Sequence, residues 1–289
     1  MENCLHDGIE RNPFARLLAV QAEDLPPPRQ HEFVAGSSET LSEVRRLENK
    51  HLLTVWLCCH LSLLKPVSCE LSQLETDFRA FIENPAFSCV GAKAALARDR
   101  MAILTARDLT SGWDDLCIYP QLFELVQRFN AAPEIFQSLV VLFEAPHDLS
   151  EEEFERHMWA RLQSLADKDA WRGLEYDPEV DRDPDSPHFS FSIGGDGFFI
   201  VGLHPHASRP ARRFRAPAIV FNIRKQFEML RAEGRYEKLR EKIIERDVAL
   251  AGTINPMLAR HGEGSEARQY SGRAVKEDWK CPFHAPHDD

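Results

Sequence analysis

The 289-residue sequence lacks an excess of basic residues, since 46 acidic side chains outnumber 35 basic ones and give a formal net charge of −11. Such a molecule repels phosphate backbones and anionic membrane surfaces unless it carries a strong local basic patch. It also lacks a long hydrophobic run, because the most apolar early stretch, 52–64, is shorter than the roughly 20 residues that span a bilayer. We therefore expect neither a nucleic acid nor a membrane as a partner.

Several motifs are absent as well. No Walker loop, GxGxxG, GxSxG or HExxH pattern occurs, which argues against nucleotide-loop, hydrolase-elbow and zincin functions. The seven cysteines are an odd number without a CxxC pair, so we expect buried free thiols. Glu2, Asp7 and Glu10 stand where a secretory signal would carry a basic segment and an apolar run. The expected location is the cytoplasm.

The composition favours one globular domain with an appendage. A hydrophobic content of 43% leaves enough apolar residues for a sizeable core. Residues 1–36 are polar and contain three consecutive prolines at 26–28, which predicts a loosely attached N-terminal arm. The remaining residues, 37–289, are expected to form a single domain.

Helices and strands are both predicted after the arm. Ser150, with Glu153 three residues later, forms a capping-box pattern that marks the start of a helix. The predicted elements are two helices within 40–83, a strand at 139–143, a helix from 151, a hairpin over 188–203, a strand at 218–222 and a helix from 224. This mixture predicts an α+β domain in which helices cover a mixed or antiparallel sheet.

The segment 202–215, GLHPHASRPARRFR, is the main candidate for a functional site. His204 and His206 follow a predicted strand, and no acidic residue lies among the four arginines beyond them: Arg209, Arg212, Arg213 and Arg215. A rigid sheet positions loops at strand ends, and arginine offers a planar set of donors for carboxylate or phosphate. The pattern predicts an anion-binding loop, or else a solvated basic loop that pairs with the acidic segment 177–185.

Two segments nearer the C-terminus carry other polar candidates. Residues 261–273 are rich in glycine and charge, and a carboxylate such as Glu266 is what a guanidinium or ammonium group would seek. Local ion pairs in a surface loop are the alternative. The chain end carries Cys281, His284 and His287, a spacing that invites a metal site. A packed anchor fits that end better, because no second half-site is evident.

Five separated blocks resemble the YqcI/YcgG family and occur in the family's order. They are CVGAKAAL at 89–96, FFIVGLHPHASRPARRF at 198–214, NPML at 255–258, SEARQYSGR at 265–273 and WKCPF at 279–283. The resemblance implies a haem-dependent monooxygenase that N-hydroxylates the guanidino nitrogen of free L-arginine or a related amino acid. It also implies a role in a natural-product biosynthetic pathway.

The resemblance implies roles for individual residues. The family's histidine falls on His204, which would be the proximal ligand of a haem b iron, with His206 and Cys281 as alternative ligands. The haem propionates would face three arginines: Arg209, Arg212 and Arg213. The substrate contacts would be Lys93, Glu266 and Tyr270. Glu266 would also be catalytic by orienting the guanidinium, and dioxygen with an external electron donor, such as a reductase, would complete the reaction.

Two other functions fit the same residues. A haem-binding carrier or sensor without catalysis would use His204 but would need no substrate carboxylate. A non-haem metal enzyme would use His204, His206 and His261 with a carboxylate, because a His-x-His pair can chelate iron or zinc. The absorption spectrum and the metal content of the purified protein separate these possibilities.

Overall fold

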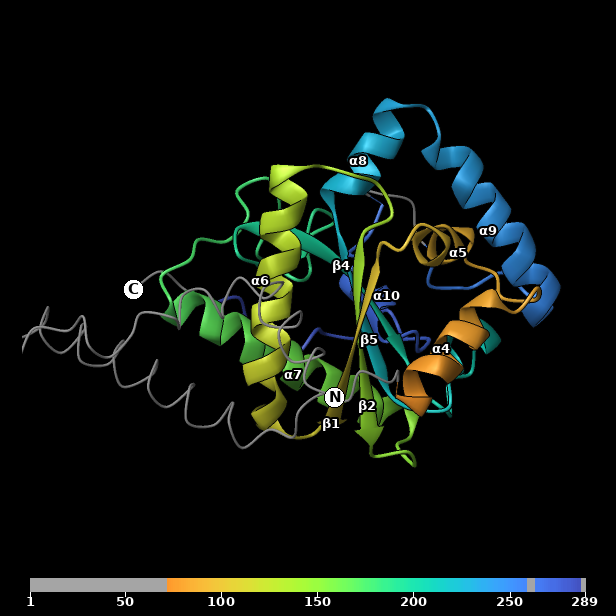
Figure 1. Cartoon of the computed structure of the whole chain (residues 1–289), viewed down its shortest axis with the longest axis horizontal. Coiled ribbons are helices and arrows are strands. Elements are labelled where there is room, and N and C mark those ends of the chain that lie inside the picture. The colour runs from red at the N-terminus through yellow and green to blue at the C-terminus, as the bar shows by residue number, and fades with distance from the viewer. Residues whose placement is uncertain (1–71, 259–262, 287–289) are drawn as a thin grey trace, which may run out of the picture. The chain divides into compact units, whose positions relative to one another are not determined.

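The computed structural model describes residues 72–258 and 263–286 (Figure 1). The predicted N-terminal arm and the first of the two helices expected within 40–83 lie outside these residues, as do His261 and His287. Three cysteines fall inside them and all are free thiols: Cys89, Cys117 and Cys281. None of the helices in the described part of the chain has the length and apolar character needed to cross a membrane.

A five-stranded mixed sheet forms the centre of the fold, with the strand order β1-β2-β5-β4-β3. The strands are β1 (Met101–Asp108), β2 (Ser138–Ala145), β3 (Phe191–Ile193), β4 (Asp196–Leu203) and β5 (Ala218–Ile223). β1 and β2 are parallel, whereas the other neighbouring pairs are antiparallel. Strands β1, β2 and β4 therefore run in the same direction and end at the same edge of the sheet. The prediction of an α+β fold with a mixed sheet is confirmed.

Helices cover both faces of this sheet (Figure 1). One face is covered by α6 (Asp115–Ala131) and α7 (Glu151–Trp171), and the other by α4 (Gln73–Glu83) and α5 (Val90–Ala97). Successive residues of a strand point to opposite faces, so a strand covered on both sides is apolar throughout. In β2, Leu139 and Val141 join the core under α6 and α7, whereas Val140 joins the second core under α4 and α5.

The remaining helices follow β5. They are α8 (Lys225–Ala232), α9 (Tyr236–Ala251) and the short α10 (Ala267–Tyr270). Helix α9 contacts α5 and contains no fully buried residue (Figure 1). Polar contacts attach it to the rest of the fold, because Arg246 donates to the carbonyls of Pro85 and Phe87, and Asp247 accepts from Arg209.

Local sequence signals account for several of these elements. Ser150 and Glu153 form the predicted capping box at the start of α7. The predicted hairpin is β3 and β4, joined through Gly194 and Gly195 with φ of 64° and 81°, a backbone region that favours glycine. The prediction that 177–185 is solvated is wrong for Asp177. Its carboxylate is buried and accepts from the main-chain nitrogens of Gly197 and Glu179.

Candidate functional site

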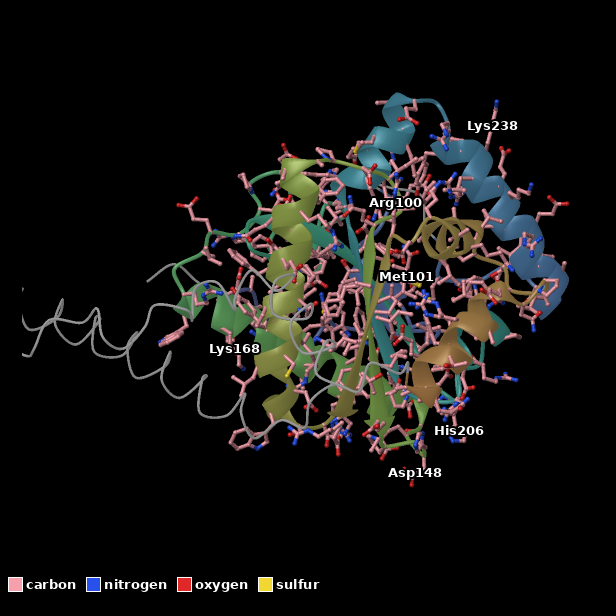
Figure 2. All side chains as sticks on the ribbon, in the orientation of Figure 1. Arg100, Met101, Asp148, Lys168, His206 and Lys238 are labelled. Atoms are coloured by element: carbon pink, nitrogen blue, oxygen red, sulfur yellow. The ribbon has the colours of Figure 1, made fainter. Side chains whose placement is uncertain are left out.

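The segment 202–215 leaves β4, forms a short 3-10 helix at Pro210–Arg212 and leads to β5. Its first loop closes on itself, because the main-chain nitrogen of His204 donates to the main-chain carbonyl of Arg212 over 3.1 Å. His206 is exposed on this loop and lies at the same edge of the sheet as Asp148 (Figure 2). The predicted position of His204 at a strand exit is confirmed, because β4 ends at Leu203. The structure adds that β1 and β2 end at the same edge of the sheet.

His204 is buried, and neither ring nitrogen has a hydrogen-bond partner among the residues that the structure describes. Its side chain is 1% exposed, and its ring stacks on Phe154 of α7 with centroids 4.4 Å apart. Burial lowers the pKa of His204 from its usual 6.5 to about 4, against a smaller upward effect of the Glu151 carboxylate. The imidazole is therefore neutral near pH 7, which is the form that binds metal ions.

Close packing between β4 and α7 holds this ring in place. A Cβ atom at Gly202 would lie 2.7 Å from Cε1 of Phe154 and 3.0 Å from the Met158 sulfur, so only glycine allows the observed approach. Gly202 and His204 are two residues apart and face the same side of the sheet. Glu151, in the first turn of α7, accepts from the Ser208 nitrogen over 2.8 Å and fixes the loop to the helix.

The arginines of this segment bind within the protein. Arg209 donates to Asp247 and to Thr253, and Arg213 donates to the carbonyls of Ala207 and Ser208. Arg215 forms an ion pair with Asp77 over 2.5 Å. These partners lie outside 177–185, so the predicted pairing with that acidic segment is wrong, although Arg213 and Arg215 are exposed as a solvated loop would have them.

Arg212 connects the end of β4 to the C-terminal segment. Its guanidinium donates to the carbonyls of Gly202, Gln269 and Tyr270 over 2.9 to 3.2 Å. Burial lowers the pKa of Arg212 from 12.5 to about 10, so the group stays charged at neutral pH. Gly272, with φ of 85°, passes so close that a Cβ atom there would lie 3.2 Å from Cγ of Arg212.

The predicted substrate residues are not gathered at His204. The Lys93 amine donates to the carbonyls of Glu83 and Asn84 over 3.1 and 2.5 Å and caps the end of α4. The Tyr270 hydroxyl is buried and donates to the Phe198 carbonyl over 3.0 Å. Phe198 lies six residues before His204 on β4, a separation of roughly 20 Å along a strand.

Glu266 lies at the same level of the sheet as Phe198. The single O–H of Ser190 has two acceptors within reach, the Phe198 carbonyl at 3.2 Å and the Glu266 carboxylate at 3.4 Å. The carboxylate therefore lies beside the β3–β4 hairpin, at a distance from the strand exit where the histidine ring is found. The structure does not bring Glu266 and His204 together.

The alternative iron ligands differ in environment. Cys281 belongs to the larger core cluster with Phe283, and burial raises the pKa of its thiol from 9.0 to about 12. The thiol is therefore protonated at neutral pH, whereas a metal ligand has to be a thiolate. Among the residues that the structure describes, no three His, Cys, Asp or Glu side chains are grouped in a way that could hold a metal ion.

A cavity of about 280 Å³ opens beside this segment. Its walls come from residues of three stretches of chain: 208–210, 251–256 and 272–274. They include Arg209 and Asn255 and do not include His204. The volume is close to the lower end of small-molecule sites, at about 300 Å³, so a ligand with the size of an amino acid suits it.

Comparison with known proteins identifies the family. The YqcI/YcgG family matches residues 78–284, which is most of the chain. The chain belongs to the YqcI/YcgG family. It is similar to the Bacillus subtilis (strain 168) protein named "Uncharacterized protein YcgG", with 26% identity over 208 residues that cover 68% of this chain and 80% of that protein. No solved structure matches the chain.

Three of the YqcI/YcgG blocks meet at the cavity, although they lie far apart in the sequence. Ser208, Asn255 and Gly272 each come from one of them and each contributes to the walls.

Sequence reasoning missed Phe154, which holds the His204 ring, and Asp247, which orients Arg209. Phe154 is one of several buried apolar residues of α7, and Asp247 is one of several charged residues of α9, so nothing in the sequence distinguishes either from its neighbours.

Proposed function

We propose that this YqcI/YcgG protein binds haem b through His204 and N-hydroxylates the guanidino nitrogen of free L-arginine or a related amino acid. The observation that carries the proposal is the buried imidazole of His204, whose two nitrogens have no partner within the described part of the chain. A buried polar group without a hydrogen bond costs about 1–3 kcal/mol, a cost that a ligand to the nitrogen would remove. The proposed setting is cytoplasmic natural-product biosynthesis.

The residues of the segment around His204 offer the two groups that a haem needs, an axial imidazole and a cationic side chain near a cavity. Haem iron takes one axial imidazole in many proteins, and His204 supplies a neutral one. His206 is exposed and Cys281 is a protonated thiol in the core, so His204 is the best placed of the three predicted ligands. Arg209 is the arginine of the segment that lines a cavity, whereas Arg212 is committed to three carbonyls.

The chain's own residues would then orient and protect the site. Stacking on Phe154 fixes the plane of the His204 ring, and the bond to the Arg212 carbonyl fixes its backbone. When bound, haem supplies the activation of dioxygen. In the overall reaction, one oxygen atom enters the N–H bond to give N–OH, and two electrons from an external reductase together with two protons from solvent convert the other into water.

A haem-binding protein without catalysis is the second candidate. It is favoured by the separation of Glu266 from His204 and by the structural roles of Lys93 and Tyr270, which cap a helix and bind a strand carbonyl. A carrier or sensor would need no carboxylate near the iron. Turnover distinguishes the two candidates, because only the first forms N-hydroxyarginine.

Absorption spectroscopy tests the iron ligand. We expect protein produced with ample haem to show a Soret band, and His204→Ala to lose it and to regain part of it when free imidazole is added. His206→Ala should keep the band, since that side chain is exposed. Colourless wild-type protein, or a band that survives in His204→Ala, would overturn the proposal. Mass spectrometry of arginine incubated with oxygen and reductant then detects the hydroxylated product.

A further inference from the structure

The cavity formed by 208–210, 251–256 and 272–274 has an unusual lining for an acidic protein. The formal net charge of the chain is −11, yet among the residues that the structure describes the lining has one charged side chain, Arg209, and no carboxylate. Ser208, Thr253 and Asn255 add hydroxyl and amide groups to the same walls. Donors on these groups favour a ligand that offers negatively charged acceptors.

Arg209 is held in a fixed orientation at this wall. Its Nη1 donates to the Thr253 hydroxyl over 3.1 Å, and its Nη2 donates to the Thr253 carbonyl over 3.0 Å and to Asp247. The side chain is only 12% exposed. Because neighbours already order the guanidinium, a ligand that binds it loses less free energy in immobilising the side chain.

Arg209 keeps donors that its neighbours do not use. A guanidinium has five N–H groups, and the three contacts above use three of them. The Nε–H is buried and has no acceptor in the described part of the chain. The side-chain oxygen of Asn255 accepts from the main-chain nitrogen of Met257 over 3.0 Å. The amide NH₂ of Asn255 is then the group of that side chain that can donate to a ligand in the cavity.

We infer that this cavity binds a carboxylate, with Arg209 as the cationic anchor and Thr253 and Asn255 beside it. Two sources of that carboxylate fit the proposed function, on which the choice of ligand rests: the α-carboxylate of the amino-acid substrate and a propionate of the haem. Arginine binds carboxylates through paired, charge-assisted hydrogen bonds. Asp247 offsets part of its charge, so the site selects a ligand by geometry as well as by charge.

Isothermal titration calorimetry of the haem-free full chain tests the amino-acid source. The probes are L-arginine and agmatine, which is arginine without its carboxylate. We expect L-arginine to bind at least about tenfold more tightly than agmatine, and Arg209→Lys to weaken arginine binding by about the same factor without affecting agmatine. Ala251→Leu, which fills the cavity from the end of α9, should weaken arginine binding too.

Two matched variants control for the substitutions themselves. Arg235→Lys changes an exposed arginine that pairs with Glu233, and Ala232→Leu makes the same enlargement at the exposed last residue of α8. Neither residue lines the cavity, so both should bind arginine as the wild type does. Thermal denaturation of all four variants identifies any that fail to fold.

Haem titration followed at the Soret band tests the second source. If Arg209→Lys and Ala251→Leu leave arginine binding unchanged but weaken haem binding, the carboxylate is a propionate. Unchanged affinity for both ligands overturns the inference, even if the protein hydroxylates arginine. Arginine binding that depends on Arg209, in a protein that develops no Soret band when haem is titrated in, supports the carboxylate site and refutes the proposed function.

Discussion

Gly202→Ala tests how closely β4 and α7 must approach to form the His204 site. The new Cβ would lie 2.7 Å from Cε1 of Phe154, whereas carbon atoms in contact are normally about 3.5–4.0 Å apart. Phe154 and Met158 are both fully buried, so neither side chain has room to rotate away. Relief therefore requires α7 to move from the sheet.

Overpacking of a core typically costs about 1–3 kcal/mol, and the buried neighbours favour the upper part of that range. Replacing glycine in a strand interior returns about 0.5–1 kcal/mol through lower backbone entropy in the unfolded chain. We expect a net loss of about 2 kcal/mol in the free energy of unfolding. For a domain of this size, the melting temperature should fall by about 4–8 °C.

Gly91→Ala is the matched control in differential scanning calorimetry. Gly91 lies in α5, where the nearest atoms to a new Cβ, Sγ of Cys89 and Cε1 of Phe136, are 3.8 Å away, an ordinary contact distance. Alanine favours a helix over glycine, so this variant should be more stable by about 0.5–1 kcal/mol. Equal stability of Gly202→Ala and the wild type would refute the close packing described for β4 and α7.

Two further predictions concern buried titrating groups. Between pH 7.5 and pH 5, the free energy of unfolding of haem-free protein should fall by about 2 kcal/mol through His204. The pKa of His204 is about 4 in the folded protein and about 6.5 in the unfolded chain, so in this range the unfolded chain takes up the proton and is stabilised by it. His204→Leu should lose correspondingly less in urea denaturation, and an equal loss would contradict the assignment. Tyr119→Phe should cost about 1–3 kcal/mol near pH 7, because Asp169 is buried and accepts from the Tyr119 hydroxyl. Burial raises the pKa of Asp169, so the destabilisation by Tyr119→Phe should become smaller as acid protonates the carboxyl group. The same destabilisation at pH 7 and in acid would refute the role given to the hydrogen bond between Tyr119 and Asp169.

The elements with strong local signals could be predicted from the sequence. The capping box at Ser150 and the hairpin around Gly194 depend on residues a few positions apart, and both are found. Strand β1 gave no such signal. It is an edge strand of the sheet with mostly half-buried residues, so neither strict alternation nor a continuous apolar run marks it.

The site was predictable only in part. The position of His204 at a strand exit followed from the hairpin pattern, and its burial was not readable because the covering residue, Phe154, lies 50 positions earlier. The substrate contacts predicted for Lys93 and Tyr270 rest on the family's sequence blocks alone. A block shows which residues occur together, whereas the contacts of Lys93 with α4 and of Tyr270 with β4 depend on how the chain folds back.

The attachment of α9 by polar contacts has a consequence for how the cavity is reached. An element without fully buried residues gains little from the hydrophobic effect, so its local unfolding requires less free energy than that of a core helix such as α7. A few polar contacts, such as the one between Arg209 and Asp247, take the place of a buried apolar face in holding α9. Amide hydrogens of α9 should therefore exchange faster than those of α7, and we expect the cavity wall that carries Ala251 to open together with this helix.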